Sequence, residues 1–289
     1  MAQELTVVVT GSTGKQGGAV ARDLLKRGHK VRAVTRDANS SQAKSLAKAG
    51  ATIVAASLED TAAITKALEG ATSLFAMTTP AGGPGAEERQ GMAAADAAKA
   101  AGVHLVFTSV GSANRNTGVP HFDSKYKVEK YIAKIGARAT ILAPVTFMEN
   151  LSYTKEQLSK GIYAAALPPQ RALAQIAVAD IGAVAVRVLE DAGRFAGRRL
   201  DLASDELTGN DAAAILARVC DRPFLYYQIP LDVVRQRMGE DAAKMYEWFD
   251  RVGFAVDRAA LRREFPDVAF QDFETWAKTQ DWNALFNSA

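Results

Sequence analysis

The sequence of 289 residues has little cysteine and little histidine, with one Cys220 and three histidines in all. A single cysteine cannot form a disulfide within the chain, and these four residues offer no cluster with zinc-ligand spacing. No apolar segment is long enough to span a bilayer, and the N-terminal residues lack the basic and apolar regions of a signal peptide. We therefore expect a cytoplasmic protein that folds without a disulfide or metal and does not bind a membrane.

The chain also lacks a strong excess of one charge. Its 35 Lys and Arg residues are nearly balanced by 32 Asp and Glu, which gives a net charge of +3 and a pI of about 8.9. The two signs are mixed along the sequence, and no helix-turn-helix pattern or basic stripe is evident. This composition argues against direct nucleic-acid binding, whereas the slight positive charge suits an anionic small ligand.

Up to about residue 144, short β-branched segments alternate with longer amphipathic segments, which is typical of repeated βαβ units. The predicted strands are Leu5–Thr10, Lys30–Arg36, Ala51–Ser57, Thr72–Met77, Val103–Ser109 and Arg138–Pro144. The predicted helices are Lys15–Gly28, Ser41–Gly50, Asp60–Gly70, Glu87–Gly102 and Phe122–Gly136. Six strands with intervening helices predict an α/β fold with a doubly wound parallel Rossmann sheet.

The alternation weakens after residue 150. The segment "KGIYAAALPPQRALAQ" indicates a loop around Pro168 and Pro169, and "VADIGAVAVRVLED" indicates a helix with Asp180 as its cap. The segments "RRLDLAS" and "FLYYQIP" indicate strands, and Leu231–Trp282 indicates a helical tail. We predict an NAD(P)-binding domain over residues 1–150 and a smaller C-terminal α/β lobe over residues 151–289, the two interleaved into one compact unit. The cleft between them is where we expect a substrate.

A glycine-rich stretch follows the first predicted strand and precedes the first helix. It has the form G-x-x-G-x-x-G, with Gly11, Gly14 and Gly17 at the fixed positions. These glycines permit a tight turn, close approach of a pyrophosphate and close packing of the helix on the sheet, and the helix N-terminus favours phosphate. The stretch predicts dinucleotide binding, with contacts from the glycines and from the residues between them, Ser12, Thr13, Lys15 and Gln16. The alternative is a glycine-rich turn without a ligand.

The end of the second strand bears on the choice of dinucleotide. An acid at this point would bind the ribose hydroxyls of NAD, whereas an arginine accommodates the 2′-phosphate of NADP. The sequence has Arg36 there and no carboxylate before Asp37. This order favours NADP (NADPH), although Asp37 weakens the local positive charge and Arg36 could instead be a solvated cation.

Three segments resemble one family. The glycine spacing with "VTR", the segment "HFDSKYKVEKYI" and the segment "PVTFMEN" are similar to the NmrA-like group of atypical short-chain dehydrogenases/reductases. The resemblance is good from Leu5 to Asn150 and fainter beyond. It implies a Rossmann fold and NADP binding. The family includes NADPH-dependent quinone and aromatic-substrate reductases, and also non-catalytic NADP-binding redox sensors and a fungal nitrogen regulator.

Ordinary short-chain dehydrogenases use a serine at the end of the fifth strand, and a tyrosine four residues before a lysine on the next helix. The corresponding residues of this sequence are Ser109, His121 and Lys125, with histidine in place of tyrosine. The resemblance implies that Ser109 contacts the cofactor. Residues four apart share a helix face, so His121 and Lys125 could act on one ligand. Lys125 would hold the nicotinamide ribose and stabilise negative charge, and His121 would donate a proton. The alternative for His121 is a capping or packing role.

The resemblance implies further cofactor contacts. Thr78 and Thr79 follow the fourth strand, where the family places the nicotinamide half of the cofactor, and Arg89 is a cation that could approach the phosphates. Phe147 would pack over the nicotinamide, and Asn150 would donate hydrogen bonds. Each of these five positions could equally be a loop, core or solvated residue.

The sequence departs from the family pattern in two places. Ser57 and Leu58 stand after the third strand, where relatives tend to have an acid that bonds the adenine, and Ser40 stands where some relatives have a further basic residue. Both departures would weaken the selectivity for NADP, so use of NAD is also plausible.

The sequence leaves two functions open. One is an NADPH-preferring oxidoreductase that transfers a hydride to a quinone, an aldehyde or another conjugated carbonyl, which we favour because Lys125 is intact. The other is a non-catalytic NADP(H)-binding sensor that acts through a regulatory protein partner, which the missing tyrosine favours. The oligomeric state is open, with a homodimer as one alternative.

Overall fold

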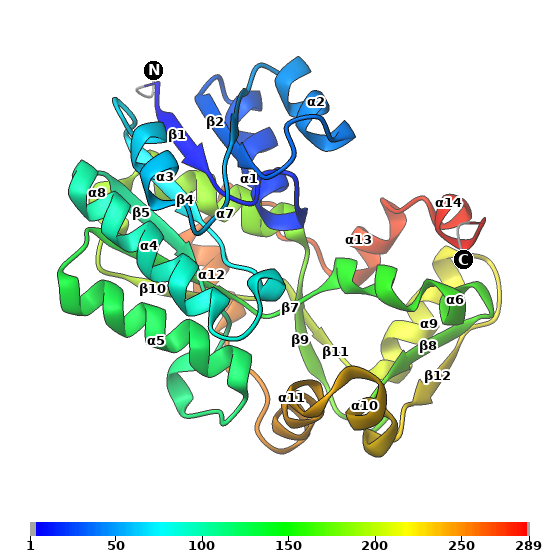
Figure 1. Cartoon of the computed structure of the whole chain (residues 1–289). Helices are drawn as coiled ribbons and strands as arrows, with labels where there is room; N and C mark the ends of the chain where they lie inside the picture. Colours follow the sequence, from blue (N-terminus) through cyan, green and yellow to red (C-terminus); the bar gives the residue numbers. More distant parts are fainter. Residues whose placement is uncertain (1–3, 288–289) are drawn as a thin grey trace. The chain divides into compact units, whose positions relative to one another are not determined.

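The structure is a computed structural model in which residues 4–287 are described (Figure 1). The chain divides into two units, and each unit is built from several stretches. Unit 1 comprises Met1–Asn114, Phe122–Ala143 and Ile181–Asp201, and unit 2 comprises Arg115–His121, Pro144–Asp180 and Leu202–Ala289. The chain thus passes between the units repeatedly.

Unit 1 is organised around a seven-stranded sheet in the order β10-β6-β5-β4-β1-β2-β3. The strands are β1 (Thr6–Val9), β2 (Lys30–Thr35), β3 (Thr52–Ala55), β4 (Ser73–Ala76), β5 (His104–Thr108), β6 (Ala139–Pro144) and β10 (Arg199–Leu202). The first six pair in parallel, which confirms the predicted doubly wound sheet. Strand β10 had been predicted as a strand but without its place at the edge of this sheet, where the Ile141 N–H donates to Arg198 O at 2.9 Å.

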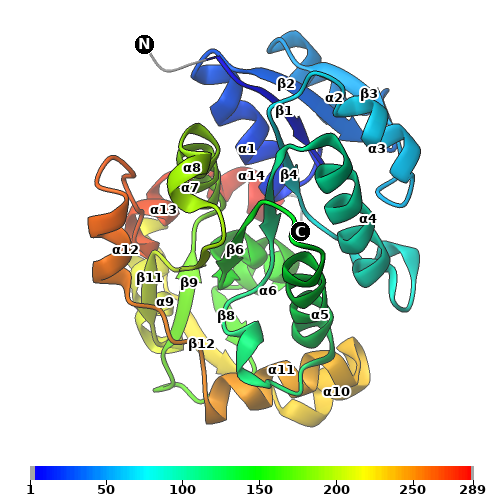
Figure 2. The same cartoon turned by 90° about the vertical axis from the view of Figure 1, so that its left-hand side faces the viewer.

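Helices cover both faces of this sheet (Figure 2). They are α1 (Lys15–Lys26), α2 (Ser41–Lys48), α3 (Thr61–Ala67), α4 (Ala86–Ala101), α5 (Pro120–Ile135), α7 (Val178–Glu190) and α8 (Ala192–Phe195). Helices α3, α4 and α5 pack on one face, where small alanines of α4 and branched residues of α5 form a continuous core with the strands. On the other face α7 meets α1, and a Cβ at Gly182 would lie 3.2 Å from the Cβ of Ala19.

Unit 2 contains two small sheets. One joins β7 (Thr146–Phe147), β9 (Leu173–Ile176) and β11 (Asp205–Leu207), and the other pairs β8 (Ile162–Ala165) in parallel with β12 (Leu225–Gln228). The loop predicted around Pro168 and Pro169 is confirmed, and β8 and β9, which were not predicted, flank it. Each of these strands has only four residues and pairs with a distant segment, so no local pattern identified them.

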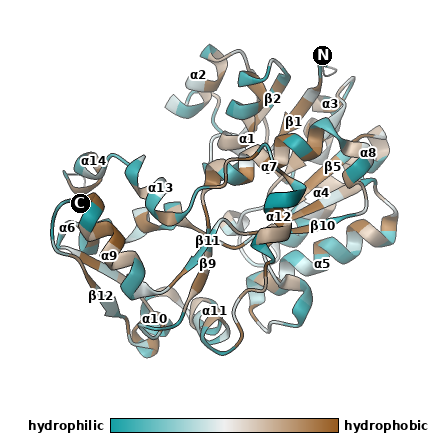
Figure 3. Ribbon diagram, turned by 180° about the vertical axis from the view of Figure 1, so that it is seen from behind, coloured by the Kyte–Doolittle hydropathy of each residue, from teal (hydrophilic) through white to brown (hydrophobic). Residues whose placement is uncertain are grey.

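The predicted helical tail is confirmed. Helices of unit 2 are α6 (Lys155–Ser159), α9 (Gly209–Val219), α10 (Leu231–Met238), α11 (Glu240–Arg251), α12 (Arg258–Glu264), α13 (Phe273–Lys278) and α14 (Trp282–Asn287). The core of unit 2 is rich in aromatic residues, with Phe273, Trp276 and Trp282 in successive contact. In Figure 3 hydrophobic residues concentrate on the strands and hydrophilic residues on the outward helix faces. Within residues 4–287, no helix is long and apolar enough to cross a bilayer.

The start of α7 differs from the prediction. The helix begins at Val178, so Asp180 lies inside its first turn and is not the cap. Its buried carboxylate instead accepts hydrogen bonds from the Gln271 N–H at 2.9 Å and from the Ser204 hydroxyl. The Val178 N–H donates to both carboxylate oxygens of Glu149 at 3.0 Å. A residue 29 positions away therefore supplies the cap that the local sequence lacks.

Candidate cofactor and active site

The loop between β1 and α1 needs glycine at two positions for steric reasons. Gly11 has a φ of +60°, and a Cβ there would lie 2.5 Å from Met77 Sδ. A Cβ on Gly17 would lie 2.4 Å from Gly11 O and 2.5 Å from Thr10 O, because α1 starts directly against the turn. A side chain at either position would displace the loop, so these glycines fix its shape.

The N-terminus of α1 has the features of an anion site. Gly14 precedes the helix and brings no side-chain cap, and the first turn contains no acidic residue. The amides of a first turn have no partner within their own helix, and the helix dipole favours negative charge there. A pyrophosphate therefore fits this end of α1.

The loop is anchored to the neighbouring strand. Ser12 Oγ is buried and donates to Val34 O at 2.9 Å, and Thr13 Oγ1 lies 3.3 Å from Thr35 Oγ1. These contacts hold the glycine loop against the end of β2. Ser12, which was predicted to contact the cofactor, thus uses its hydroxyl within the protein.

Arg36 follows β2 and is exposed. It has no ion pair or hydrogen bond to any residue from 4 to 287, so its guanidinium is available to a ligand. The Asp37 carboxylate accepts from the Asn39 N–H at 2.8 Å, and Ser40 caps α2 through the Ala43 N–H at 3.3 Å. The acid next to Arg36 is therefore engaged in its own turn.

The residues after β3 form a turn. Ser57 is exposed, and its hydroxyl accepts from the Glu59 N–H at 3.3 Å, while Leu58 is half-buried. No carboxylate stands at the two predicted adenine contacts themselves. Glu59 instead pairs with Arg89 at 3.3 Å.

Arg89 also donates to Pro84 O at 3.0 Å and to Gly82 O at 3.4 Å, and its side chain is 53% exposed. The structure thus ties this cation to the loop before α4. Its contact with the phosphates remains a prediction.

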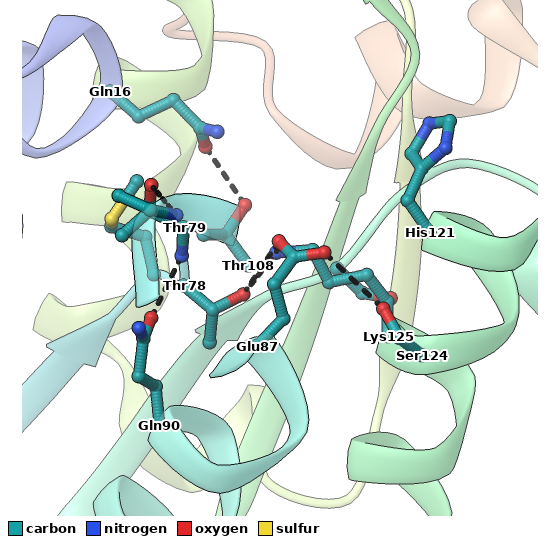
Figure 4. Close-up of polar contacts among 12 residues, drawn as sticks. Gln16, Thr78, Thr79, Glu87, Gln90, Thr108, His121, Ser124 and Lys125 are labelled. Atoms are coloured by element: carbon teal, nitrogen blue, oxygen red, sulfur yellow. Dashed lines mark hydrogen bonds and ion pairs between the residues drawn. The ribbon is translucent and has the colours of Figure 1, made fainter. Parts of the chain in front are cut away.

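The ends of β1, β4 and β5 meet at one edge of the sheet. The Met77 N–H donates to Thr10 Oγ1 at 3.0 Å, and Thr108 Oγ1 donates to Gln16 Oε1 at 2.8 Å. The Thr79 N–H donates to Gln90 Oε1 at 2.9 Å, which fixes the segment after β4 (Figure 4). These contacts bring the glycine loop next to Thr78 and Thr79, and ligands of open α/β sheets bind at this edge.

Lys125 joins the same edge from α5. Its Nζ lies 2.8 Å from Glu87 Oε1 on α4 and donates a hydrogen bond to the buried Thr78 hydroxyl. The Glu87 carboxylate also accepts from Thr78 Oγ1 at 3.2 Å and from Ser124 Oγ at 3.3 Å (Figure 4). Burial lowers the pKa of Lys125, and the charge and hydrogen bond of Glu87 oppose this decrease.

Ser109 is buried at the end of β5, and its hydroxyl donates to Glu129 Oε1. Burial raises the pKa of Glu129, whereas Arg199, whose Nε lies 3.0 Å from Glu129 Oε2, opposes the increase. The serine expected to contact the cofactor is thus bonded to an acid of α5.

His121 has a carboxylate partner in unit 2. Its Nδ1 lies 2.7 Å from Asp241 Oδ2, and its backbone N–H donates to Asp241 Oδ1 at 3.2 Å. The side chain is 35% exposed. The structure therefore gives His121 and Lys125 different acidic partners, one in each unit.

Phe147 and Asn150 both belong to unit 2 and are half-buried. Phe147 ends β7, and Asn150 lies in the 3₁₀ segment Met148–Thr154. Their predicted contacts with the nicotinamide remain predictions.

Sequence reasoning missed Glu87, Glu129 and Asp241, the acids that contact Lys125, Ser109 and His121. Glu87 stands in "AEERQ" at the start of α4, where acidic residues are common because they suit the helix dipole. Because this local role explains an acid at position 87, the sequence offers no reason to expect its buried ion pair with Lys125. The partner of Asp241 is 120 positions away, and no signal in the sequence indicates it.

Residues 3–277 match the NmrA-like family. Quinone oxidoreductase 2 of Escherichia coli (strain K12) is 30% identical over 226 residues, which cover 77% of each chain. FrzB, an NmrA-like family domain-containing oxidoreductase of a Cladobotryum species, is 36% identical over 159 residues. That match covers 50% of this chain and 47% of FrzB, so the chain spans about half the length of that relative.

Two solved structures have the same fold. NmrA, described as a negative transcriptional regulator and crystallised with NAD, aligns with a TM-score of 0.83 and 22% identity over 99% of this chain and 98% of its own. The NADPH complex of the Escherichia coli quinone oxidoreductase aligns with a TM-score of 0.79 and 24% identity over 94% of this chain and 98% of its own. The match of the family model over nearly the whole sequence shows that the chain belongs to the NmrA-like family.

Proposed function

We propose that this protein is an NADPH-preferring oxidoreductase, able to use NADH as well, that reduces a quinone, an aldehyde or another conjugated carbonyl. The observation that carries the proposal is the buried Lys125 ammonium at the same sheet edge as the glycine loop. A lysine at this position suits orientation of a ribose and stabilisation of an oxyanion. The quinone oxidoreductase relative supports the choice of substrate class.

Different residues of unit 1 bind different parts of the cofactor in this proposal. The amides of the loop and the first turn of α1 bind the pyrophosphate, and Arg36 binds the 2′-phosphate. Lys125, beside Thr78, holds the nicotinamide ribose and stabilises negative charge on the acceptor oxygen. When bound, the nicotinamide cofactor supplies the hydride.

His121 is the proposed proton donor. Asp241 contacts its Nδ1, which orients the ring. The assignment depends on how His121 lies toward a bound substrate, and the assay below tests it.

The second candidate function is that of a redox sensor that binds NADP(H) without turnover and acts through a protein partner. Two observations favour it. Histidine replaces the tyrosine of ordinary short-chain dehydrogenases at position 121, and the Ser109 hydroxyl is already bonded to Glu129. NmrA, a negative transcriptional regulator, has the same fold.

The test is NADPH oxidation, followed by absorbance, with a panel of quinones and aldehydes, after fluorescence has confirmed that each protein binds NADPH. Lys125→Ala and His121→Phe should each lower kcat/KM by about a hundredfold or more. Lys127→Ala, which removes an exposed lysine of the same helix, should leave the rate unchanged. Tight NADPH binding without oxidation of NADPH by any compound would instead support the sensor.

The choice of NADPH over NADH is tested at Arg36. Arg36→Ala should raise the KM for NADPH about ten- to a hundredfold, since it removes charge-assisted hydrogen bonds to the 2′-phosphate. The KM for NADH, which lacks this phosphate, should stay the same. An equal increase for both cofactors would contradict a role in selectivity.

A further inference from the structure

Two ion pairs join helices α4 and α5. Glu87 pairs with Lys125 and Glu88 pairs with Lys127, both at 2.8 Å. The side chains of the first pair are 13% and 12% exposed, and those of the second pair are 28% and 56% exposed. Adjacent acids on one helix thus make one buried and one solvated contact with the next helix.

The buried pair is part of a connected set of hydrogen bonds. Glu87 Oε1 accepts from Lys125 and Thr78, and Oε2 accepts from Ser124 at 3.3 Å. The side chain of Glu87 is therefore held at three points. An acid that only favoured the helix N-terminus would need none of them.

The Lys125 ammonium has three donors. Among residues 4–287, Glu87 and Thr78 accept from it, so one N–H is left for a ligand oxygen. We propose that Glu87 is a positioning residue that holds the Lys125 ammonium charged and against Thr78, with its remaining donor directed to a cofactor or substrate oxygen. This inference rests on the proposed function, because it assigns Lys125 a ligand.

The charge of Lys125 depends on Glu87. Burial favours the neutral amine, and within the described part of the chain Glu87 is the charged group that opposes it. The other groups that face the amine are the hydroxyl of Thr78, after β4, and that of Ser124, on α5 itself, which reaches the amine through Glu87. Neither hydroxyl titrates in the accessible range, so among the described residues that contact the amine Glu87 supplies the balancing charge.

The direct test is the pKa of Lys125 in the ligand-free protein, measured by NMR titration of 13C-labelled lysines and assigned with Lys125→Met. Glu87→Gln should lower this pKa by about one to three pH units, as the loss of an adjacent opposite charge does. Glu88→Gln should leave it unchanged. Glu87→Asp, which keeps the charge, should restore most of the wild-type value even if Glu87→Gln folds poorly.

The functional test is the pH profile of NADPH binding and oxidation. Activity that needs charged Lys125 falls as the pH rises through its pKa, so Glu87→Gln should move this decrease to lower pH while Glu88→Gln leaves it in place. Equal Lys125 titration in the two glutamine variants would overturn the proposal. If the wild type oxidises no NADPH, the proposed reductase is wrong, and the NMR titration still decides whether Glu87 holds the charge on Lys125.

Discussion

At the residue scale, the structure shows how much space surrounds Gly17 and how deeply His104 is buried, which the sequence pattern alone does not give. The glycine motif predicts a tight turn, and the structure shows why it allows no methyl group at Gly17, where a Cβ would lie 2.4 Å from Gly11 O. Nothing in the sequence predicted the buried position of His104. His104 is buried on β5, where its Nε2 lies 3.0 Å from Thr140 Oγ1 and its Nδ1 has no partner in the described part of the chain.

The first prediction concerns Gly17. Gly17→Ala should lower the free energy of unfolding by about 1–3 kcal/mol, because the new methyl group overlaps backbone atoms of the preceding turn. Urea unfolding measures this change. Gly193→Ala is the matched control, since a Cβ at this helical glycine has no neighbour within 4 Å. It should raise stability by about 0.4–1 kcal/mol, and a loss of equal size in both variants would contradict the steric explanation.

The second prediction concerns His104 and pH. Burial lowers the pKa of His104 to about 4, with a smaller contribution from Arg138. The unfolded chain therefore binds a proton between pH 6.5 and 4 that the folded chain does not, so the folded state loses stability as the pH falls through this window. The loss approaches about 3 kcal/mol.

The measurement is the difference in unfolding free energy between the wild type and His104→Gln at a series of pH values. The glutamine does not titrate, so any advantage of the wild type at pH 7 should shrink as the pH falls to 4. A difference that is constant with pH would show that His104 titrates normally.

At the scale of elements, some helices are capped by neighbouring residues of the sequence and others by residues far away in the sequence. Helix α9 has a local capping box, in which the Thr208 side chain and Asp211 bond each other's backbone N–H. Helix α7 has none. Its cap is Glu149, which also accepts from Trp276 Nε1 at 3.0 Å and so links α7 to α13 within unit 2.

The third prediction follows from this shared carboxylate. Glu149→Ala should lower the free energy of unfolding by about 1–3 kcal/mol, because it leaves the Val178 and Trp276 N–H groups without their acceptor. Glu156→Ala is the control, since Glu156 makes an exposed pair with Lys160 and its loss should leave the stability nearly unchanged. Chemical denaturation of both variants measures their free energies of unfolding. An equal decrease in the two variants would contradict the capping role of Glu149.

At the scale of the whole molecule, the chain returns to unit 1 late, and this return completes a partly buried network of charges around the buried Glu129. Arg199 on β10 pairs with Glu129 of α5 at 3.0 Å, bonds Asp201 and donates to Val110 O at 2.9 Å. Asp201 accepts from the Ser112 N–H at 3.1 Å. The network connects the segment after β5 to α5 and β10. It also fixes the position of Glu129, which accepts a hydrogen bond from the Ser109 hydroxyl.

The fourth prediction tests this network. Arg199→Met should lower the free energy of unfolding by about 3–5 kcal/mol, because it leaves the buried Glu129 without its positive partner. The double variant Arg199→Met with Glu129→Gln removes the unpaired charge as well, so it should recover part of the loss. Thermal and urea unfolding of the two variants give the comparison. A double variant as unstable as Arg199→Met alone would show that packing, and not charge, dominates.

The sequence by itself determined the family, the six strands β1–β6 and the glycine loop. Hydrophobic periodicity and turn chemistry are set by residues a few positions apart, so they can be read along the chain. The tertiary structure decided which charges meet. Glu87 with Lys125, Glu129 with Arg199 and Asp241 with His121 are separated by tens to more than a hundred positions. Packing of helices and strands selects these partners, and no local pattern specifies them, because each acid is equally compatible with an exposed position in its own helix.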